Sequence, residues 1–429
     1  MKNKTNNFLK IVALINLFFL AQTNLVAQEL FPLKVNNKWG LYNNRGEKKI
    51  SIEKDYYSIL EFNDGIALFQ KTEFMQYFGY INEKGEEVIE PKYLWKYYFK
   101  DGIARAYLDN YGFIDKNGEV IIDFKYDIAQ EFSEGLAAVK IGEKYGYIDK
   151  KDTVIIPLIY DYASSFSEGF AAVKLNDKYA FIDKNGVPLT EFKYRTVIDF
   201  SEGMAMVMTD KGVGYIDKTG KEIIAPRYNE GHQHFVNGLA MVKLDKKIGF
   251  VDKTGKEIIA TKYEEAGDFK DGLIPVKLNN KYGFVNKLGQ TIIDLKYDIV
   301  GYFSNNLAVV TLDSKSGFID KTGKVIIPLK YDICGEFKTN LAPVILNSKG
   351  GYIDATGKEV IALQYDDLSF FSEDLASVKS NGKYGYINTI GKLMIPFEYD
   401  KAEAFTNGVA KVTLDGKEFY INKLGKKIE

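Results

Sequence analysis

The stretch from Phe132 to Ser165 reads FSEGLAAVKIGEKYGYIDKKDTVIIPLIYDYASS and contains three short strand-forming runs. These runs are LAAVK at 136–140, KYGYID at 144–149 and VII at 154–156, which are rich in the apolar, aromatic and β-branched residues that favour strands. The third run stops at Pro157, because proline cannot donate a hydrogen bond to a neighbouring strand. The stretch therefore predicts three short strands joined by turns.

The same unit recurs through nearly the whole chain, as the glycine of its second strand shows. Successive copies are 39, then 33, then 34 or 35 residues apart, and a fixed period of roughly 20–50 residues marks a solenoid, a propeller or an array. Ala180 and Phe419 take the place of this glycine in two copies. The glycines are Gly40, Gly79, Gly112, Gly146, Gly214, Gly249, Gly283, Gly317, Gly351 and Gly385.

Two turn positions in the unit predict a left-handed backbone. The position of Gly135, before the first strand, is glycine in most copies and otherwise only Asn or Asp, as at Asn306, Asn340 and Asp374. Glycine that exchanges only with these two residues is typical of a positive φ. In the turn after the second strand glycine recurs as well, and Asp152 is the exception.

The motifs FSEGLAxVK, KYGYIDKxGK and IIPxxYD resemble those of the WG-repeat (KWG) family of bacterial proteins, and Trp39-Gly40 carries the pair that names it. The resemblance covers about residues 31 to 429. It implies a secreted or envelope-associated interaction module, and it implies no shared catalytic residues.

The first 27 residues have the features of a secretory signal peptide. Lys2, Lys4 and Lys10 precede an apolar run of 11 residues at 11–21, which is too short to span a bilayer as a helix. We therefore expect an exported protein, periplasmic, at the outer surface or secreted, with no membrane span after cleavage. The remaining chain carries 54 basic and 58 acidic residues, a balance that does not favour nucleic-acid binding.

Little in the sequence indicates catalysis, a metal or another cofactor. Cys334 is the only cysteine, and no phosphate-binding loop or nucleophile motif occurs. The only histidines, His232 and His234, lie in one loop that is a residue longer than its counterparts. His-x-His can supply two metal ligands, so an enzyme or metal site near them is the alternative to a non-enzymatic protein.

The residue before the glycine of the second strand is aromatic in seven copies, and polar in Ser316 and Glu418. We interpret this column as a partly exposed rim of rings that either binds a polysaccharide or a protein, or covers the sheet edges. The candidate ligand-binding residues are Trp39, Phe78, Tyr111, Tyr145, Tyr179, Tyr282 and Tyr384.

The sequence thus predicts an all-β protein of tandem units with about three strands each. Residues 28–429 form a continuous array of about eleven full units and a C-terminal partial one, whose atypical first and last copies suit caps. We expect an elongated solenoid or superhelix; two propeller-like rings of six units are the alternative, since each connector has room for a short fourth strand. The function that we expect is an exported scaffold that binds a protein or a polysaccharide.

Overall fold

The computed structural model describes residues 30–73, 77–94, 97–231 and 234–428, and these contain strands and turns but no helix. The strands form twelve units, numbered here in chain order; most are four-stranded antiparallel sheets, and one seven-stranded sheet combines units 2 and 3. The all-β, repeated architecture is therefore confirmed. The expected signal peptide at 1–27 lies outside the described residues.

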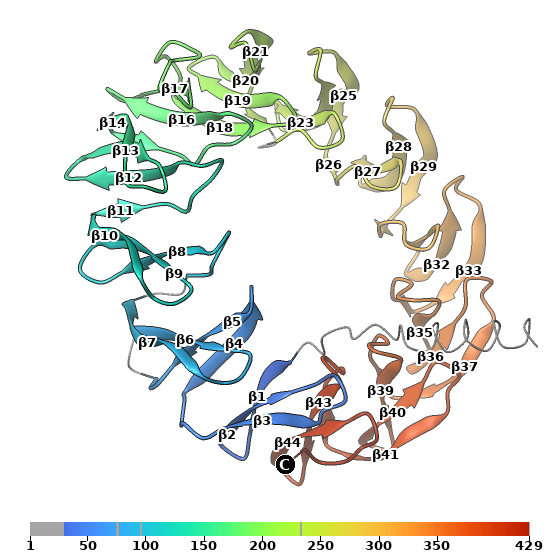
Figure 1. The fold of residues 1–429 in the computed structure, drawn as a ribbon. Coiled ribbons are helices and arrows are strands. Elements are labelled where there is room, and N and C mark those ends of the chain that lie inside the picture. Colours follow the sequence, from blue (N-terminus) through green and yellow to red (C-terminus); the bar gives the residue numbers. More distant parts are fainter. Residues whose placement is uncertain (1–29, 74–76, 95–96, 232–233, 429) are drawn as a thin grey trace, which may run out of the picture.

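Within a unit the strands pair in chain order, and the first strand lies toward the centre of the molecule and the last toward its periphery (Figure 1). The inner strands, most of them two residues long, are β4 (Ser58–Asn63), β11 (Ile128–Ala129), β15 (Tyr162–Ala163), β18 (Thr196–Ser201), β22 (Glu230–Gly231), β26 (Glu265–Ala266), β30 (Ile299–Val300), β34 (Ile333–Cys334), β38 (Asp367–Leu368) and β42 (Lys401–Ala402). The second strands are β1 (Phe31–Val35), β5 (Ile66–Gln70), β8 (Ile103–Tyr107), β12 (Ala137–Ile141), β16 (Phe170–Leu175), β19 (Met204–Thr209), β23 (Leu239–Leu244), β27 (Leu273–Leu278), β31 (Leu307–Leu312), β35 (Ala342–Leu346), β39 (Leu375–Ser380) and β43 (Val409–Leu414).

The third strands are β2 (Lys38–Tyr42), β6 (Tyr77–Asn82), β9 (Tyr111–Asp115), β13 (Lys144–Ile148), β17 (Lys178–Asp183), β20 (Gly212–Asp217), β24 (Lys247–Asp252), β28 (Lys281–Asn286), β32 (Lys315–Asp320), β36 (Lys349–Ile353), β40 (Lys383–Asn388) and β44 (Lys417–Asn422). The outer strands are β3 (Lys48–Ile52), β7 (Glu87–Leu94), β10 (Val120–Tyr126), β14 (Val154–Tyr160), β21 (Glu222–Tyr228), β25 (Glu257–Tyr263), β29 (Thr291–Tyr297), β33 (Val325–Tyr331), β37 (Glu359–Tyr365) and β41 (Leu393–Tyr399).

The glycine of the third strand is required by the outer strand beside it. The outer strand bulges between Ile156 and Tyr160, and a Cβ on Gly146 would lie 2.5 Å from the carbonyl oxygen of Ile156. The two copies that replace this glycine, with Ala180 and Phe419, lie in units 5 and 12. Neither unit has a regular outer strand among the described residues; in unit 5 only isolated bridges join the third strand to the segment that follows it, at Tyr179 with Tyr194 and Ile182 with Pro188.

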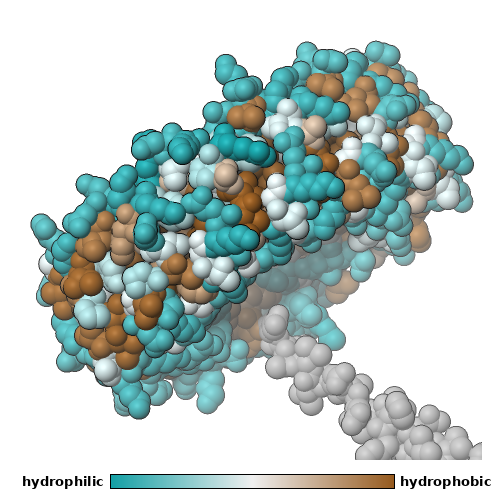
Figure 2. Space-filling view, turned by 90° about the horizontal axis from the view of Figure 1, so that it is seen from above, coloured by the Kyte–Doolittle hydropathy of each residue, from teal (hydrophilic) through white to brown (hydrophobic). Residues whose placement is uncertain are grey.

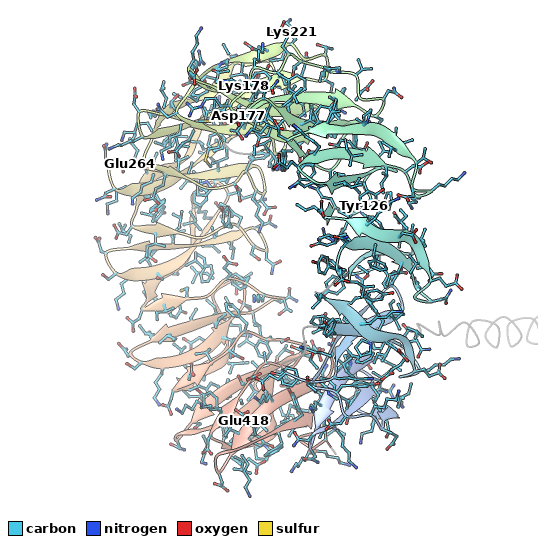
Figure 3. All side chains as sticks on the ribbon, turned by 90° about the vertical axis from the view of Figure 1, so that its left-hand side faces the viewer. Tyr126, Asp177, Lys178, Lys221, Glu264 and Glu418 are labelled. Atoms are coloured by element: carbon cyan, nitrogen blue, oxygen red, sulfur yellow. The ribbon has the colours of Figure 1, made fainter. Side chains whose placement is uncertain are left out.

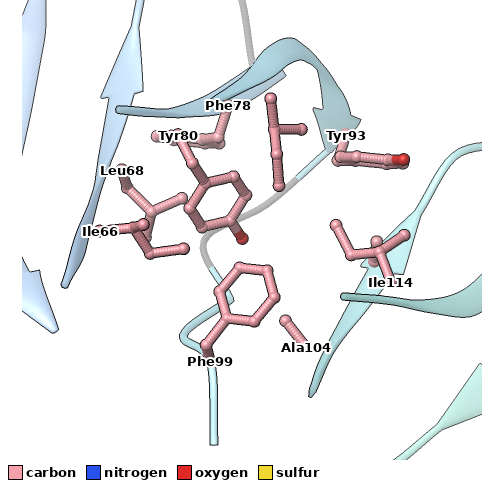
Figure 4. Packing of buried hydrophobic residues seen from close by; sticks show 10 residues of the cluster. Ile66, Leu68, Phe78, Tyr80, Tyr93, Phe99, Ala104 and Ile114 are labelled. Atoms are coloured by element: carbon pink, nitrogen blue, oxygen red, sulfur yellow. The ribbon is translucent and has the colours of Figure 1, made fainter. Parts of the chain in front are cut away.

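The core lies between the facing sheets of neighbouring units. Between units 2 and 3, Tyr80 and Tyr93 pack against Phe99 and Ile114 (Figure 4). The ring that follows the glycine is buried, and its hydroxyl also forms a bond: Tyr80 donates a hydrogen bond of 2.7 Å to the carbonyl of Tyr97. Tyr147, Tyr352 and Tyr386 make the equivalent bond.

Where the turn before the second strand reads Ser-Glu-Gly, it links its unit to the next one, as at 167–169. Glu168, with φ of 53°, accepts a hydrogen bond of 2.9 Å from the N–H of Gly203 and forms an ion pair with Lys218 at 3.1 Å. Ser167 donates to the carbonyl of Phe200 at 2.9 Å. The positive φ predicted for Gly135 is observed at 93°, but the left-handed glutamate before the glycine was not predicted.

The array curves into one closed ring (Figure 1). Leu33 and Tyr42 of unit 1 pack against Val409 and Ile428 of unit 12, so the first and last units are neighbours rather than free caps. This corrects the expected overall shape, which was elongated or divided into two rings. From above, the ring is seen edge-on as a slab with apolar side chains scattered among hydrophilic ones (Figure 2), and the described side chains leave its middle open (Figure 3).

Candidate functional site

The seven candidate rings lie at or near the start of the third strand, beside the turn that joins it to the second strand. Six of them are half-buried, which agrees with the expected rim. Phe78 differs, because it is only 7% exposed and belongs to the core between units 2 and 3. It therefore offers no surface to a ligand.

A lysine of the second strand lies opposite several of these rings. Lys174 pairs with Tyr179 across β16 and β17, and its ammonium nitrogen lies 5.8 Å from the ring centre. Such cation–π contacts explain why the rings are only half exposed. The same contact, at 5.1 to 5.8 Å, joins Lys34 to Trp39, Lys140 to Tyr145, Lys277 to Tyr282 and Lys379 to Tyr384.

Three of the rings are also held by hydrogen bonds. Tyr282 donates to Glu265 at 2.5 Å and Tyr384 donates to Asp367 at 2.6 Å, in each case to an acid on the inner strand of the same sheet. The bond to Asp367, together with burial, raises the pKa of Tyr384 to about 12. The indole N–H of Trp39 donates to the carbonyl of Tyr56 at 2.7 Å. These bonds fix the rings within the fold.

Tyr145 and Tyr179 are different, since no hydrogen bond joins either hydroxyl to another described residue. Between them lies Tyr162 of the inner strand β15, with ring-centre distances of 6.0 Å to Tyr145 and 5.9 Å to Tyr179. Tyr162 is 38% exposed. We call Tyr145, Tyr162 and Tyr179 the tyrosine patch; it crosses the boundary between units 4 and 5.

Sequence reasoning missed Tyr162, although the sequence contains a signal for it. It is the only described aromatic residue at its position, two after the tyrosine that ends the preceding outer-strand segment; the other units have residues such as Ile128, Glu265 and Asp367 there. In the sequence this position is aromatic only at Trp95 and Tyr162, so an aromatic residue here marks a departure from the other copies.

A second aromatic group lies in units 2 and 3 around Tyr111. Its ring centre is 4.8 Å from that of Tyr107 and 6.2 Å from that of Tyr97. The guanidinium of Arg105 lies 4.5 Å from the Tyr97 ring and donates a hydrogen bond of 2.7 Å to the carbonyl of Ala129. Because Tyr97 is buried and Arg105 is bound to the next unit, this group stabilises the boundary between units 3 and 4.

The structure brings no metal-binding group together around the histidines. His232 lies outside the described residues, and His234 is exposed. No three His, Cys, Asp or Glu side chains in the described ranges are grouped so as to hold a metal ion. The nearby Asp199 accepts a hydrogen bond of 2.8 Å from the hydroxyl of Ser164; burial raises the pKa of this carboxyl, which the Ser164 bond and the charge of His234 partly oppose.

Comparisons with solved structures give only distant likenesses. A eukaryotic initiation factor is 12% identical over 68% of this chain and 94% of its own, with a TM-score of 0.32. The extracellular domain of a hybrid two-component system from B. thetaiotaomicron is 8% identical over 94% of this chain and 76% of its own, with a TM-score of 0.24. PorZ of Porphyromonas gingivalis is 12% identical over 91% of this chain and 68% of its own, with a TM-score of 0.20. Such low scores support no conclusion about function.

The sequence comparison is more definite. No curated protein matches the chain. The family model described as "WG containing repeat" matches ten segments, at 78–110, 111–145, 145–179, 180–211, 214–247, 248–282, 282–315, 317–349, 351–384 and 384–417. These segments cover most of the chain and have the period of the structural units, each beginning in the third strand of one unit and ending in the next unit. The chain therefore belongs to the WG-containing repeat family.

Proposed function

We propose that this chain is an exported, non-enzymatic scaffold that binds a polysaccharide or a protein segment in the cell envelope through the tyrosine patch. The observation that carries the proposal is the contact of Tyr145, Tyr162 and Tyr179 across two units, with partly exposed rings and with no hydrogen bond from the hydroxyl of Tyr145 or Tyr179 to another described residue.

The chemistry of the patch suits an extended ligand. Aromatic rings offer large apolar faces, and tyrosine adds a hydroxyl that can bond to a sugar or a peptide group. Lys140 and Lys174 lie beside two of the rings and supply further donors. A ligand that follows the boundary between the units contacts several rings in succession.

Export is supported by the leader, in which three lysines precede the apolar run. The part of the chain that the structure describes contains no helix with the length and hydrophobicity needed to cross a bilayer. Cell fractionation followed by N-terminal sequencing tests this part of the proposal. Cytoplasmic protein that still begins with Met1 would refute it.

Binding is tested on a glycan array and by affinity capture from an envelope extract, each with the wild type and with the double variant Tyr145→Ser, Tyr179→Ser. We expect the double variant to lose a ligand that the wild type retains, while its circular dichroism is unchanged. The matched control is Tyr282→Ser, because Tyr282 occupies the same strand position outside the patch. Equal binding by wild type and double variant would refute the role of the patch, and loss only on His232→Ala would favour a local site in that loop.

A further inference from the structure

Unit 1 departs from the others at its outer strand. In unit 4 the outer strand bulges, so that Tyr145 pairs with Tyr160 but Tyr147 pairs with Ile156. In unit 1 the pairing of β2 with β3 instead continues without a bulge through Gly40 with Ser51 to Trp39 with Ile52. The residues that follow, 53–55, then form an exposed loop before the buried Tyr56.

This departure creates two adjoining hollows that share residues 51–54. The first, of about 450 Å³, lies over Trp39, and the second, of about 670 Å³, extends toward Glu86 and Glu90 of unit 2. Both volumes fall within the range of roughly 300–1,000 Å³ that is typical of small-molecule sites.

The first hollow combines one aromatic ring with many polar groups. Asn36 and Asn37 form the hairpin turn, with φ of 50° and 63°, and both residues line the hollow together with Ser51 and Glu53. The hydrogen bond from the Trp39 indole to the carbonyl of Tyr56 fixes the orientation of the ring. The site is therefore preorganised, with an apolar face and both donors and acceptors around it.

The charges around the first hollow are mixed in sign. Lys54 forms an ion pair with Glu87 at 3.0 Å, and Asp55 lies 4.0 Å from the ammonium of Lys34, so both are paired with residues outside the lining. The remaining charged residues of the lining are Lys38 and Lys48, which are positive, and Glu53, which is negative. A ligand with a net charge gains little from such a lining, whereas a neutral ligand rich in hydroxyls can bond to both kinds of group.

We propose that the hollow over Trp39 binds one or two rings of an uncharged saccharide. One sugar face lies against the indole, and the hydroxyls bond to the amides of Asn36 and Asn37, to Ser51 and to Glu53. This site lies in unit 1, apart from the tyrosine patch of units 4 and 5, and it does not depend on what the patch binds.

The chain offers its own reporter for this site. Only two tryptophans are present, so Trp95→Phe leaves Trp39 as the sole source of indole fluorescence. We would titrate this variant with cellotriose and chitotriose, which are neutral, and with trigalacturonic acid and the chitosan trimer, which are charged. We expect a saturable change in fluorescence with a neutral trimer and a response at least tenfold weaker with both charged ones.

Two substitutions test the geometry without removing the indole. Asn37→Gly keeps the left-handed turn, because Gly382 adopts a φ of 80° at the same position in unit 11, and Ser51→Ala removes one exposed hydroxyl. Together they should weaken binding about tenfold or more, since lost hydrogen bonds contribute about 1 kcal/mol each. The double variant Tyr145→Ser, Tyr179→Ser should bind as the parent does. The proposal is overturned if neither neutral trimer changes the fluorescence up to about 10 mM, if a charged trimer binds better, or if the Asn37 and Ser51 substitutions leave the affinity unchanged.

Discussion

Asp152 gives a sharp test of how neighbouring units are held together. It replaces a turn glycine, keeps the left-handed backbone with φ of 65°, and accepts a hydrogen bond of 2.6 Å from the hydroxyl of Tyr126 in the preceding unit. Lys125 also bonds to its carboxylate. The hydroxyls of Tyr93, Tyr194, Tyr297 and Tyr331 are buried without a partner among the described residues. We therefore expect Asp152 to stabilise the boundary between units 3 and 4 through Tyr126.

The perturbation is Asp152→Gly, made in the wild type and in a Tyr126→Phe background. In the wild type the change loses a hydrogen bond to a charged group, worth about 1.5–3 kcal/mol. The change also removes the strain of a non-glycine residue in a left-handed conformation, which stabilises the protein by about 1–2 kcal/mol. The net effect is a destabilisation of about 0.5–1 kcal/mol. In the Tyr126→Phe background the bond from the Tyr126 hydroxyl is already absent, and only the partly exposed pair with Lys125, worth about 0–1 kcal/mol, is lost. The same change should therefore stabilise by about 1 kcal/mol. The change in stability caused by Asp152→Gly therefore has opposite signs in the two backgrounds, and the two values differ by about 2 kcal/mol.

The assay is native-state hydrogen exchange followed by mass spectrometry on peptides from units 3 and 4. Local opening energies are preferable to a melting curve, because long repeat arrays often do not unfold in a two-state manner. Tyr331→Phe is the matched control, since it removes a hydroxyl that has no partner among the described residues, and it should be neutral or slightly stabilising. The reasoning fails if Asp152→Gly has the same effect in both backgrounds to within about 0.5 kcal/mol.

Two further predictions concern a turn and a carboxyl group. Gly135→Val should destabilise the protein by more than about 1 kcal/mol, because a β-branched residue is strained at a φ of 93°. Gly135→Asn should be much milder, since Asn306 occupies the same position in another unit with a φ of 64°. Equal denaturant midpoints for the two variants would contradict this prediction. Burial raises the pKa of Asp199, so its contribution to stability is greatest below the ordinary aspartate pKa of about 3.9 and is lost as the pH rises through the higher folded value. Asp199→Asn, which can still accept the bond from Ser164, should therefore be more stable than the wild type at pH 7 but not at pH 3, as measured by thermal unfolding at the two pH values.

Much of the fold was predictable because its signals are local and repeated. The glycine that exchanges with Asn and Asp indicated the left-handed turn at Gly135. Asp152, which replaces the glycine of the other turn, has the left-handed backbone predicted for that position. Ring closure was not predictable in the same way. The angle between neighbouring units depends on how side chains such as Tyr80 and Phe99 pack between two sheets, and the repeat pattern does not encode that angle directly.

The candidate site was predictable only in part. Half-buried rings were expected and are found, but burial of Phe78 and capture of the Tyr282 hydroxyl by Glu265 depend on neighbours that the period alone does not reveal. Ligand binding by the remaining rings stays a prediction. Tyr162 was overlooked because the comparison of repeats looked for residue types that recur at equivalent positions, and Tyr162 differs from the residues at its equivalent positions.

Closure also restricts how the gene for such a protein can evolve. In an open array the number of units can change by duplication or deletion, because a free end is simply moved. In this ring the contact of Leu33 and Tyr42 with Val409 and Ile428 exists only when the turns from unit to unit add up to a full circle, about 30° for each of the twelve steps. If one unit were lost, the angle at every remaining boundary would have to increase to close the ring. Otherwise these apolar side chains would be exposed to water. Relatives that share the closed form should therefore preserve copy number more strictly than they preserve the sequence of any single unit.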